Sequence, residues 1–379
     1  MFIYIILFLI FLSASIIYRG QDVSLYKKQY YFLCVLLSFV SGIRYHIGSD
    51  TGVYIDQFSM IPNISDLFLF IENWNEVLWY IFISVLKTIV DDFIIVQIVH
   101  SLIVNLLIGR VIFKLCKKPF WALFFFLCCH WWNFNFEIMR ESLCVALYLN
   151  VLYNYLQNKN ISYFIIFSLP IIFIHQFAFV PILFTILTHF FTYRSVLIGG
   201  MFISIIFYFI ISDAFILQIM DSWGSGVFSE DVTDRILLYS DSDLYGFKTL
   251  SLLGTGLILL TNFICSFVLS KEEENEVIAK LLLLYAFVVI LRLKLLIMSR
   301  FYNYWELLLF VCAINYLCNN GNLLKKVYLY FCLIFFLYVG INIFLHPLDD
   351  SNSKYNIKYI PYASYIDKTI CPERESFFY

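Results

Sequence analysis

Long apolar segments alternate with short polar breaks along almost the whole chain. A helix that crosses a bilayer needs about 20 apolar residues, and runs of about 15–23 apolar residues recur here between breaks. They lie near residues 2–18, 30–43, 92–113, 119–134, 141–157, 161–177, 179–193, 195–212, 249–270, 277–297, 301–318 and 324–344. The pattern predicts an all-α fold, a polytopic helical bundle with about twelve membrane crossings.

One further segment, 74–90, is apolar but carries Glu76 and Lys87. Cytoplasmic loops hold an excess of lysine and arginine. If 74–90 is interfacial or re-entrant, the polar breaks that carry lysine or arginine all fall on the cytoplasmic side. Their basic residues are Arg19, Lys27, Lys28, Lys114, Lys117, Lys118, Lys159, Arg194, Lys271, Lys325 and Lys326. If it crossed, the lysines at 114–118 would lie outside. We therefore interpret 74–90 as not crossing, with both termini outside.

This topology gives one transmembrane domain, 1–345, followed by an extracytoplasmic tail, 346–379. Two extracytoplasmic loops stand out, at 44–75 and at 213–247, and the second is strongly acidic. Charged residues that follow apolar segments at the outer face are then expected to meet there.

The composition supports a membrane protein, with 62% hydrophobic and 14% charged residues and a mean hydropathy of +0.84. A soluble domain does not hide that much apolar surface. The net charge of −2 and the lack of a basic patch speak against a nucleic-acid partner. Most of the ten cysteines lie inside apolar runs, which indicates packing rather than disulfides.

The densest polar stretch runs from Arg44 to Phe58 and directly follows an apolar segment. Arg44 is either an interfacial residue that reaches lipid headgroups or a planar donor that holds a diphosphate. Asp50 either bonds its own loop backbone or orients a sugar hydroxyl. We take Arg44, His46 and Tyr54 as candidates for substrate binding and Asp50 as a candidate catalytic group.

Three more polar residues interrupt apolar surroundings in the first half of the chain. Glu76 heads the 74–90 segment, as a helix-start carboxylate or as an acid–base group. Arg140 starts a predicted span between Glu137 and Glu141, as a surface ion-pair partner or as a phosphate ligand. His175 lies in a wholly apolar run, where an ionisable residue marks function by default. Glu76 and His175 are candidate catalytic residues.

Later in the chain, another apolar region is interrupted by Arg292, Arg300 and Tyr304. These three residues are further candidates for substrate binding. Tyr304 follows Arg300 by four residues, which would place both on one helix face. We find no tight carboxylate cluster in the sequence that would hold a metal ion.

These residues resemble the EpsG-like family of polysaccharide polymerases, which are related in role to Wzy-type O-antigen polymerases. The similarity rests on Arg44-Tyr45-x-Ile-Gly-x-Asp50 with Tyr54, on Glu76, Ile138-Met139-Arg140, Phe173-Ile174-His175, Arg300 with Tyr304, and Pro361-Tyr362. It covers roughly residues 40 to 365. The chain departs from the family pattern at Thr51 and at Glu141, a carboxylate that would compete for Arg140.

The resemblance implies a glycosyltransferase without metal or cofactor in the bacterial inner membrane. Its substrates would be oligosaccharide repeat units on undecaprenyl diphosphate, joined at the outer face into O-antigen, capsule or exopolysaccharide. Membrane lipid and a chain-length regulator protein are the partners that it suggests. Arg44, Arg140 and Arg300 would bind the diphosphate leaving group, and His175, Asp50 or Glu76 would act as the base.

Two other classes of protein also need buried arginines and a polar path. A flippase for the same lipid-linked unit would spread its charges along a central cavity on both sides of the midplane. A ligase that moves the finished chain, or a membrane acyltransferase, would gather them at one face, as a polymerase does.

Overall fold

The structure is a computed structural model that describes residues 2–18, 23–70, 76–209, 249–272, 275–292, 296–318, 323–345, 358–369, 371 and 374. It confirms the all-helical fold: over these ranges it contains no strand, only an isolated bridge between Arg44 and Ser364. The acidic loop predicted at 213–247 lies outside the described residues. The chain divides into two compact units, 1–182 with 317–320 and 333–379, and 183–316 with 321–332.

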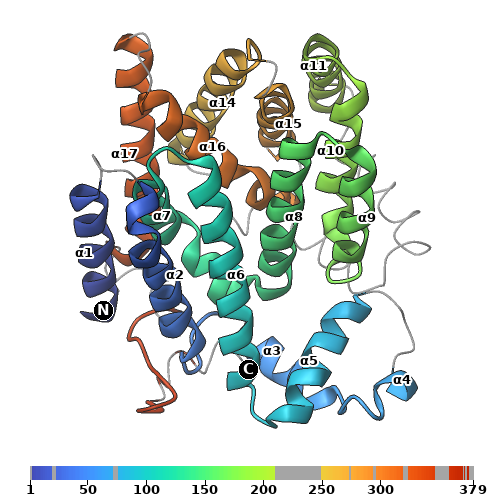
Figure 1. The fold of residues 1–379 in the computed structure, drawn as a ribbon, viewed down its shortest axis with the longest axis vertical. Coiled ribbons are helices and arrows are strands. Elements are labelled where there is room, and N and C mark those ends of the chain that lie inside the picture. The colour runs from blue at the N-terminus through green and yellow to red at the C-terminus, as the bar shows by residue number, and fades with distance from the viewer. Residues whose placement is uncertain are drawn as a thin grey trace. The chain divides into compact units, whose positions relative to one another are not determined.

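The first unit carries most of the N-terminal half (Figure 1). Its helices are α1 (Phe2–Ile17), η1 (Val23–Tyr26), α2 (Lys27–Gly42), α3 (Thr51–Met60), α4 (Leu67–Phe70), α5 (Val77–Ile89), α6 (Ile94–Leu115), α7 (Pro119–Cys129), the π-helical turn η2 (Asn133–Glu137), α8 (Met139–Asn158), α9 (Ile161–Ile172) and η3 (Gln176–Ala178).

The second unit contains α11 (Tyr193–Phe209), α14 (Thr249–Leu269), α15 (Glu276–Arg292), η5 (Leu296–Phe301) and most of α16 (Tyr302–Cys318). The unit boundaries fall within α10 (Phe179–Phe190) and α17 (Leu323–Leu345). Each of the twelve apolar segments found in the sequence thus contains a helix. All ten cysteines are free thiols, and seven of them are buried, as expected of cysteines that pack inside apolar segments.

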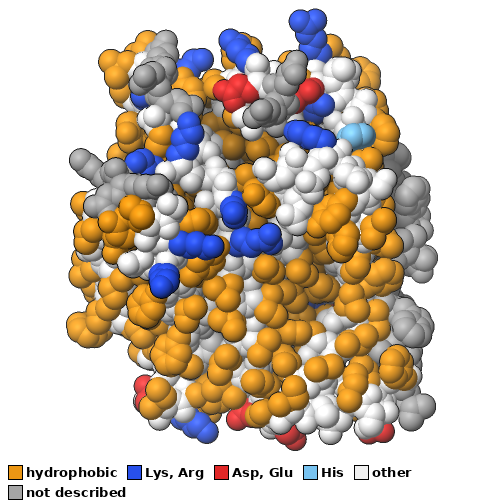
Figure 2. Space-filling view, in the orientation of Figure 1, with side chains coloured by type: hydrophobic (Ala, Val, Ile, Leu, Met, Phe, Trp, Pro, Cys, Tyr) orange, Lys and Arg blue, Asp and Glu red, His pale blue; other side chains and the backbone are white. Residues whose placement is uncertain are grey.

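The number of membrane crossings stays a prediction. In the described part of the chain only α6, with 22 residues, is both long and apolar enough to cross by itself. Several other apolar helices have 10–17 residues, fewer than the usual ~20. Over α2 and α6 the surface is broadly hydrophobic, with basic side chains above this area and acidic ones at its lower edge (Figure 2).

The doubtful segment 74–90 forms α5, a helix of 13 residues. At 1.5 Å per residue it is about 20 Å long, which is short of a ~30 Å hydrocarbon core. Its Lys87 points back to α3, where the ammonium donates to the carbonyls of Phe58 at 2.7 Å and Ile61 at 2.9 Å. Lys87 therefore caps the end of α3 and links α5 to α3, and whether 74–90 crosses the membrane stays a prediction.

Helix α6 organises the first unit through a stripe of buried polar side chains, Gln97, His100, Ser101 and Asn105. Asn105 and Asn135 of the π-helical turn exchange amide hydrogen bonds of 3.0 and 3.3 Å. Ser38 of α2 donates to the Ser101 carbonyl at 3.2 Å. Because an unpaired polar group is costly in an apolar surrounding, these bonds fix which elements pack on α6.

Glycines let α2 approach α6 closely. A Cβ at Gly109 would lie 2.5 Å from the Cys34 sulfur, and one at Gly42 would lie 2.9 Å from the Ile98 Cα. The hydroxyl of Tyr30 also donates to the Gly109 carbonyl at 3.0 Å. Small residues at a helix–helix contact are typical of packing in membranes.

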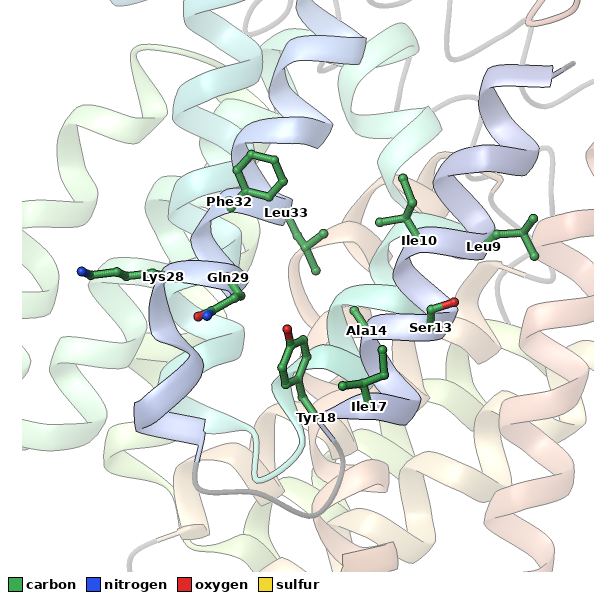
Figure 3. Close-up of a pocket in the computed structure, with 10 residues that line it drawn as sticks. All are labelled: Leu9, Ile10, Ser13, Ala14, Ile17, Tyr18, Lys28, Gln29, Phe32 and Leu33. Atoms are coloured by element: carbon green, nitrogen blue, oxygen red, sulfur yellow. The ribbon is translucent and has the colours of Figure 1, made fainter.

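Between α1 and α2 the surface is hollowed into an open groove of ≈ 650 Å³ (Figure 3). Apolar side chains such as Ile10 and Leu33 line most of it, and polar residues, Tyr18 and Gln29, lie toward the end where α2 begins. Helix α1 packs mainly on α7 instead.

The loop after α2 is held by the distant C-terminal tail. These contacts are backbone hydrogen bonds. The amide of Tyr45 donates to the Ala363 carbonyl and the amide of Tyr365 to the Ile43 carbonyl, both at 2.9 Å. The Gly48 amide donates to the Lys358 carbonyl at 3.0 Å. Loop and tail thus lie at one end of the unit, as the predicted topology requires of two extracytoplasmic segments.

Gly48 has no room for a side chain. Its φ is +100°, a conformation that favours glycine, and an added Cβ would lie 2.3 Å from the Phe136 carbonyl oxygen. The residue thus permits close contact with the π-helical turn of the chain itself.

We expect Gly48→Ala to destabilise the fold by about 1–3 kcal/mol because it combines a strained φ with a backbone clash. The measurement is the melting temperature of the purified protein in detergent. Gly256→Ala is the matched control, because nothing lies within 4 Å of that position. Equal melting temperatures for the two variants would contradict the assignment.

Candidate functional site

Three elements of the first unit bring Glu76, Arg140 and His175 into direct contact. Both oxygens of the Glu76 carboxylate are engaged, Oε2 by the Arg140 guanidinium and Oε1 by Nδ1 of His175. The three residues come from the start of α5, the start of α8 and the turn after α9. These helix ends lie close together in Figure 1. Residues far apart in the sequence thus form one charged cluster.

The local backbone explains how Glu76 reaches this position. Glu76 precedes α5 with a left-handed φ of 58°, and its side chain makes no capping hydrogen bond. The next turn is attached to the end of α9, where the Leu78 amide donates to the Phe173 carbonyl at 3.0 Å. Glu76 thus stands at the start of α5 as the sequence suggested, and its carboxylate pairs with Arg140 and His175.

His175 lies where α9 has ended. Pro170 stands inside the last turn of α9, and His175 follows with an extended backbone at φ −154°. Its ring donates from Nδ1 to the carboxylate, which can only accept, so the neutral ring carries its lone pair on Nε2. Within the described residues the ring makes no second hydrogen bond, which leaves Nε2 available to a substrate.

Arg140 begins α8 directly after the π-helical turn, a type of irregularity that often occurs at functional sites. Besides Glu76 it hydrogen-bonds the Tyr54 hydroxyl from α3. Tyr54 packs edge-on against Trp79 of α5 at 5.9 Å. A guanidinium has five N–H donors, so these two partners leave donors for an anionic ligand. The sequence suggested Glu141 as the competing carboxylate, but the ion pair forms with Glu76.

The cluster is largely but not fully buried. The exposed fractions are 18% for the Arg140 side chain, 12% for Glu76 and 7% for His175. Burial raises the pKa of Glu76, but hydrogen bonds and charges from His175 and Arg140 outweigh it and leave the pKa below its usual value. Burial raises the pKa of Tyr54 to about 12, so this hydroxyl stays protonated.

The arrangement can bind an anion and remove a proton. A carboxylate that orients an imidazole through Nδ1, with Nε2 directed to a reacting hydroxyl, is a general-base pair. The partly exposed guanidinium beside it supplies positive charge for a developing or departing anion. Glu76 joins both functions because it contacts both partners.

Arg44, another candidate for substrate binding, lies inside the protein and is 0% exposed. Its guanidinium donates to the Ser41 carbonyl at 2.7 Å and to the Met139 sulfur at 3.4 Å. It also lies 5.1 Å from the centre of the Phe136 ring. Through these contacts Arg44 links the loop after α2 to the start of α8. A role of Arg44 in substrate binding stays a prediction.

His46 and Asp50 flank Gly48 in the same loop. The His46 ring stacks on Tyr45 at 4.3 Å, and its carbonyl accepts from Arg374 of the tail at 3.1 Å. Asp50 is exposed at the start of α3, and its side chain makes no capping hydrogen bond. Their predicted roles remain open.

Glu137 forms a contact with the loop after α2 that the sequence did not indicate. Its carboxylate accepts hydrogen bonds from the Ser49 amide at 3.1 Å, the Ser49 hydroxyl and the Asp50 amide at 3.3 Å. From the sequence it was considered only as a neighbour of Arg140. No local sequence pattern indicates a hydrogen bond between two residues that are 88 positions apart.

The remaining candidates belong to the second unit and are described there alone. The Arg292 guanidinium lies 5.3 Å from the centre of the Tyr302 ring, and Tyr304 is fully buried. Arg300 lies in the 3-10 helix η5, whereas Tyr304 lies in α16. The break between the two elements means that a spacing of four does not by itself place them on one face.

Among the described residues no group of three or more histidine, cysteine, aspartate or glutamate side chains is arranged to hold a metal ion. Independence from metal stays a prediction.

Comparison with known proteins identifies one family. The model of the EpsG family matches residues 27–364, nearly the whole chain. No curated protein and no solved structure matches.

The shared carboxylate makes stability depend on pH. The pKa of Glu76 is lower in the folded than in the unfolded state, so its ionised form stabilises the fold above the unfolded pKa. This contribution is lost as the pH falls through the folded pKa. We expect the melting temperature of the wild type to fall more steeply below about pH 4.5 than that of Glu76→Gln. Asp66→Asn, at an exposed loop position, should leave the wild-type slope intact. Identical slopes for Glu76→Gln and the wild type would refute the ion-pair assignment.

Proposed function

Because the chain belongs to the EpsG family, which comprises Wzy-like polysaccharide polymerases, we propose that it joins undecaprenyl-diphosphate-linked oligosaccharide repeat units into a polymer. The reaction takes place at the outer face of the bacterial inner membrane and supplies O-antigen, capsule or exopolysaccharide. The observation that carries this proposal is the contact of the Glu76 carboxylate with Arg140 and His175, which places a cation beside a general base.

Glycosyl transfer from a lipid diphosphate requires two events at adjacent positions. The bond between the anomeric carbon and the diphosphate oxygen breaks, and the leaving group takes the electron pair. The hydroxyl of the acceptor sugar attacks that carbon and loses its proton. A fixed cation stabilises the first event and a base assists the second.

His175 is the base in this proposal. Its Nε2 accepts the hydroxyl proton, and the imidazolium that forms is stabilised by the ionised Glu76 at Nδ1. Glu76 also fixes the ring orientation, because both Leu78 and the cluster itself hold the start of α5 against the end of α9. Asp50 lies exposed at the start of α3, outside the cluster, so we assign it to substrate hydroxyls and not to proton removal.

Arg140 binds the diphosphate. Its planar fork suits two phosphate oxygens at once, and its engagement by Glu76 and Tyr54 fixes its direction in advance. Preorganised charge of this kind is effective because little reorganisation is needed when the leaving group departs.

The positions of the charges favour an enzyme over a transporter. Glu76, Arg140 and His175 gather at neighbouring ends of α5, α8 and α9. A flippase would be expected to distribute such groups along the length of its helices.

Deletion of the gene in the bacterium that carries it is the first test. We expect the surface polysaccharide to collapse to single repeat units, because flipping and attachment continue without polymerisation. A gel of the extracted polysaccharide measures the chain length. Loss of even the single-unit form would identify a flippase, and an unchanged polymer would reject both functions.

The second test concerns Arg140. Arg140→Lys keeps the charge but loses the fork, so we expect the rate of polymerisation to fall roughly 30- to 1,000-fold, equivalent to about 2–4 kcal/mol of transition-state stabilisation. The assay uses purified protein in vesicles and the lipid-linked unit that accumulates in the deletion strain. Arg110→Lys is the matched control, since Arg110 binds Asn150 of the same unit at 2.9 Å and lies on α6 away from the cluster. Normal rates for both variants would refute the diphosphate role.

A further inference from the structure

The most unusual polar residue outside the cluster is His100, in the middle of α6. It is 0% exposed, and no part of the function above uses it. Its Nε2 lies 2.8 Å from the carbonyl oxygen of Met139 and 3.1 Å from the hydroxyl of Ser142. Both partners belong to the first turn of α8, the turn that carries Arg140.

The hydrogen bond from His100 holds the carbonyl of the peptide group that joins Met139 to Arg140. The Met139 carbonyl and the Arg140 amide belong to one planar unit, so a donor that holds the carbonyl also fixes the orientation of the Arg140 backbone. The Ser142 hydroxyl donates to the same carbonyl at 3.0 Å. Met139 is also held at its sulfur by Arg44. The residue before Arg140 is thus fixed at its backbone and at its side chain.

The protonation of His100 follows from its partner. A carbonyl oxygen can only accept, so Nε2 carries the proton and the neutral ring keeps a lone pair on Nδ1. In the described structure Nδ1 is buried and has no hydrogen-bond partner. Such a group costs stability in an apolar surrounding. The polar contacts of this costly side chain all run from Nε2 to the first turn of α8, which points to the Nε2–H donor as its contribution.

We propose that His100 is a positioning residue for Arg140: through the Met139 carbonyl it sets the place of the guanidinium that binds the diphosphate. The inference rests on the proposed function of Arg140. A displacement of about 1 Å at a catalytic group costs roughly 100-fold in rate, so the loss of this donor should affect catalysis even when the protein is well folded.

Two substitutions of His100 test the hydrogen-bond donor separately from the imidazole ring. In glutamine the amide nitrogen is as many bonds from Cα as Nε2 of histidine, whereas in asparagine it is one bond shorter and does not reach Met139. We expect His100→Gln to keep most of the turnover. His100→Asn should lower kcat about 10- to 100-fold with little change in KM, because the diphosphate contact acts mainly in the transition state.

Rescue by glutamine gives a readout that a general loss of packing would not give. Glutamine and asparagine both lack the imidazole ring, and only glutamine keeps a donor within reach of the Met139 carbonyl. We therefore expect kcat to be high in His100→Gln and low in His100→Asn and in Arg140→Gln. The double variant His100→Asn/Arg140→Gln should be no slower than Arg140→Gln alone, because both changes remove the same contact.

The assay is the vesicle assay above, with the lipid-linked unit from the deletion strain. If Arg140→Gln turns over normally, the proposed function fails, and this inference fails with it. If Arg140→Gln is slow but His100→Asn is normal, or their effects multiply, only the positioning role is overturned. Should His100→Asn not reach the membrane, Ser142→Ala takes its place, because it removes the other donor to the Met139 carbonyl: a lower kcat at unchanged KM supports the role, and an unchanged kcat overturns it.

Discussion

Polar groups inside an apolar helical bundle must find partners within the protein, because neither lipid nor apolar side chains can supply them. In the first unit this constraint acts along α6, whose buried stripe from Gln97 to Asn105 meets α2, the π-helical turn and α8. Apolar contacts alone would allow these helices to slide or rotate, whereas hydrogen bonds between fixed atoms allow one arrangement. The position of Arg140 in the first turn of α8 depends on this arrangement.

The constraint also explains why the charged cluster is tightly linked. Glu76, Arg140 and His175 would each be costly in a poorly hydrated environment, but together they satisfy one another with one carboxylate between two partners. An anionic ligand that enters such a site finds donors already oriented. The contacts that satisfy the three buried charges are thus the same contacts on which the proposed function depends.

The helices and many polar candidates were predictable because their signals are local. Apolar runs marked all twelve segments, and the isolation of His175 and Arg140 in apolar sequence marked them for function. Partners across long distances were not predictable. Nothing near Glu76 in the sequence indicates His175, 99 residues away, and nothing near Arg44 shows that its guanidinium is enclosed. His100 also lies in an apolar run, but nothing near it in the sequence indicates its partners Met139 and Ser142, 39 and 42 residues away.

The pairing of the first polar loop with the tail has a consequence for biogenesis. Gly48 emerges from the ribosome early, yet its partner Lys358 is made 310 residues later, and Tyr4 bonds the carbonyl of Tyr359 across 355 positions. At about 5–20 residues per second the loop waits roughly 15–60 s for its partner. During this interval the segment before α3 lacks the backbone hydrogen bonds that the tail supplies, so the loop reaches its final structure only after residue 365 has been made. A nascent chain cut short before the tail would contain every residue of the cluster and still leave the loop without its support.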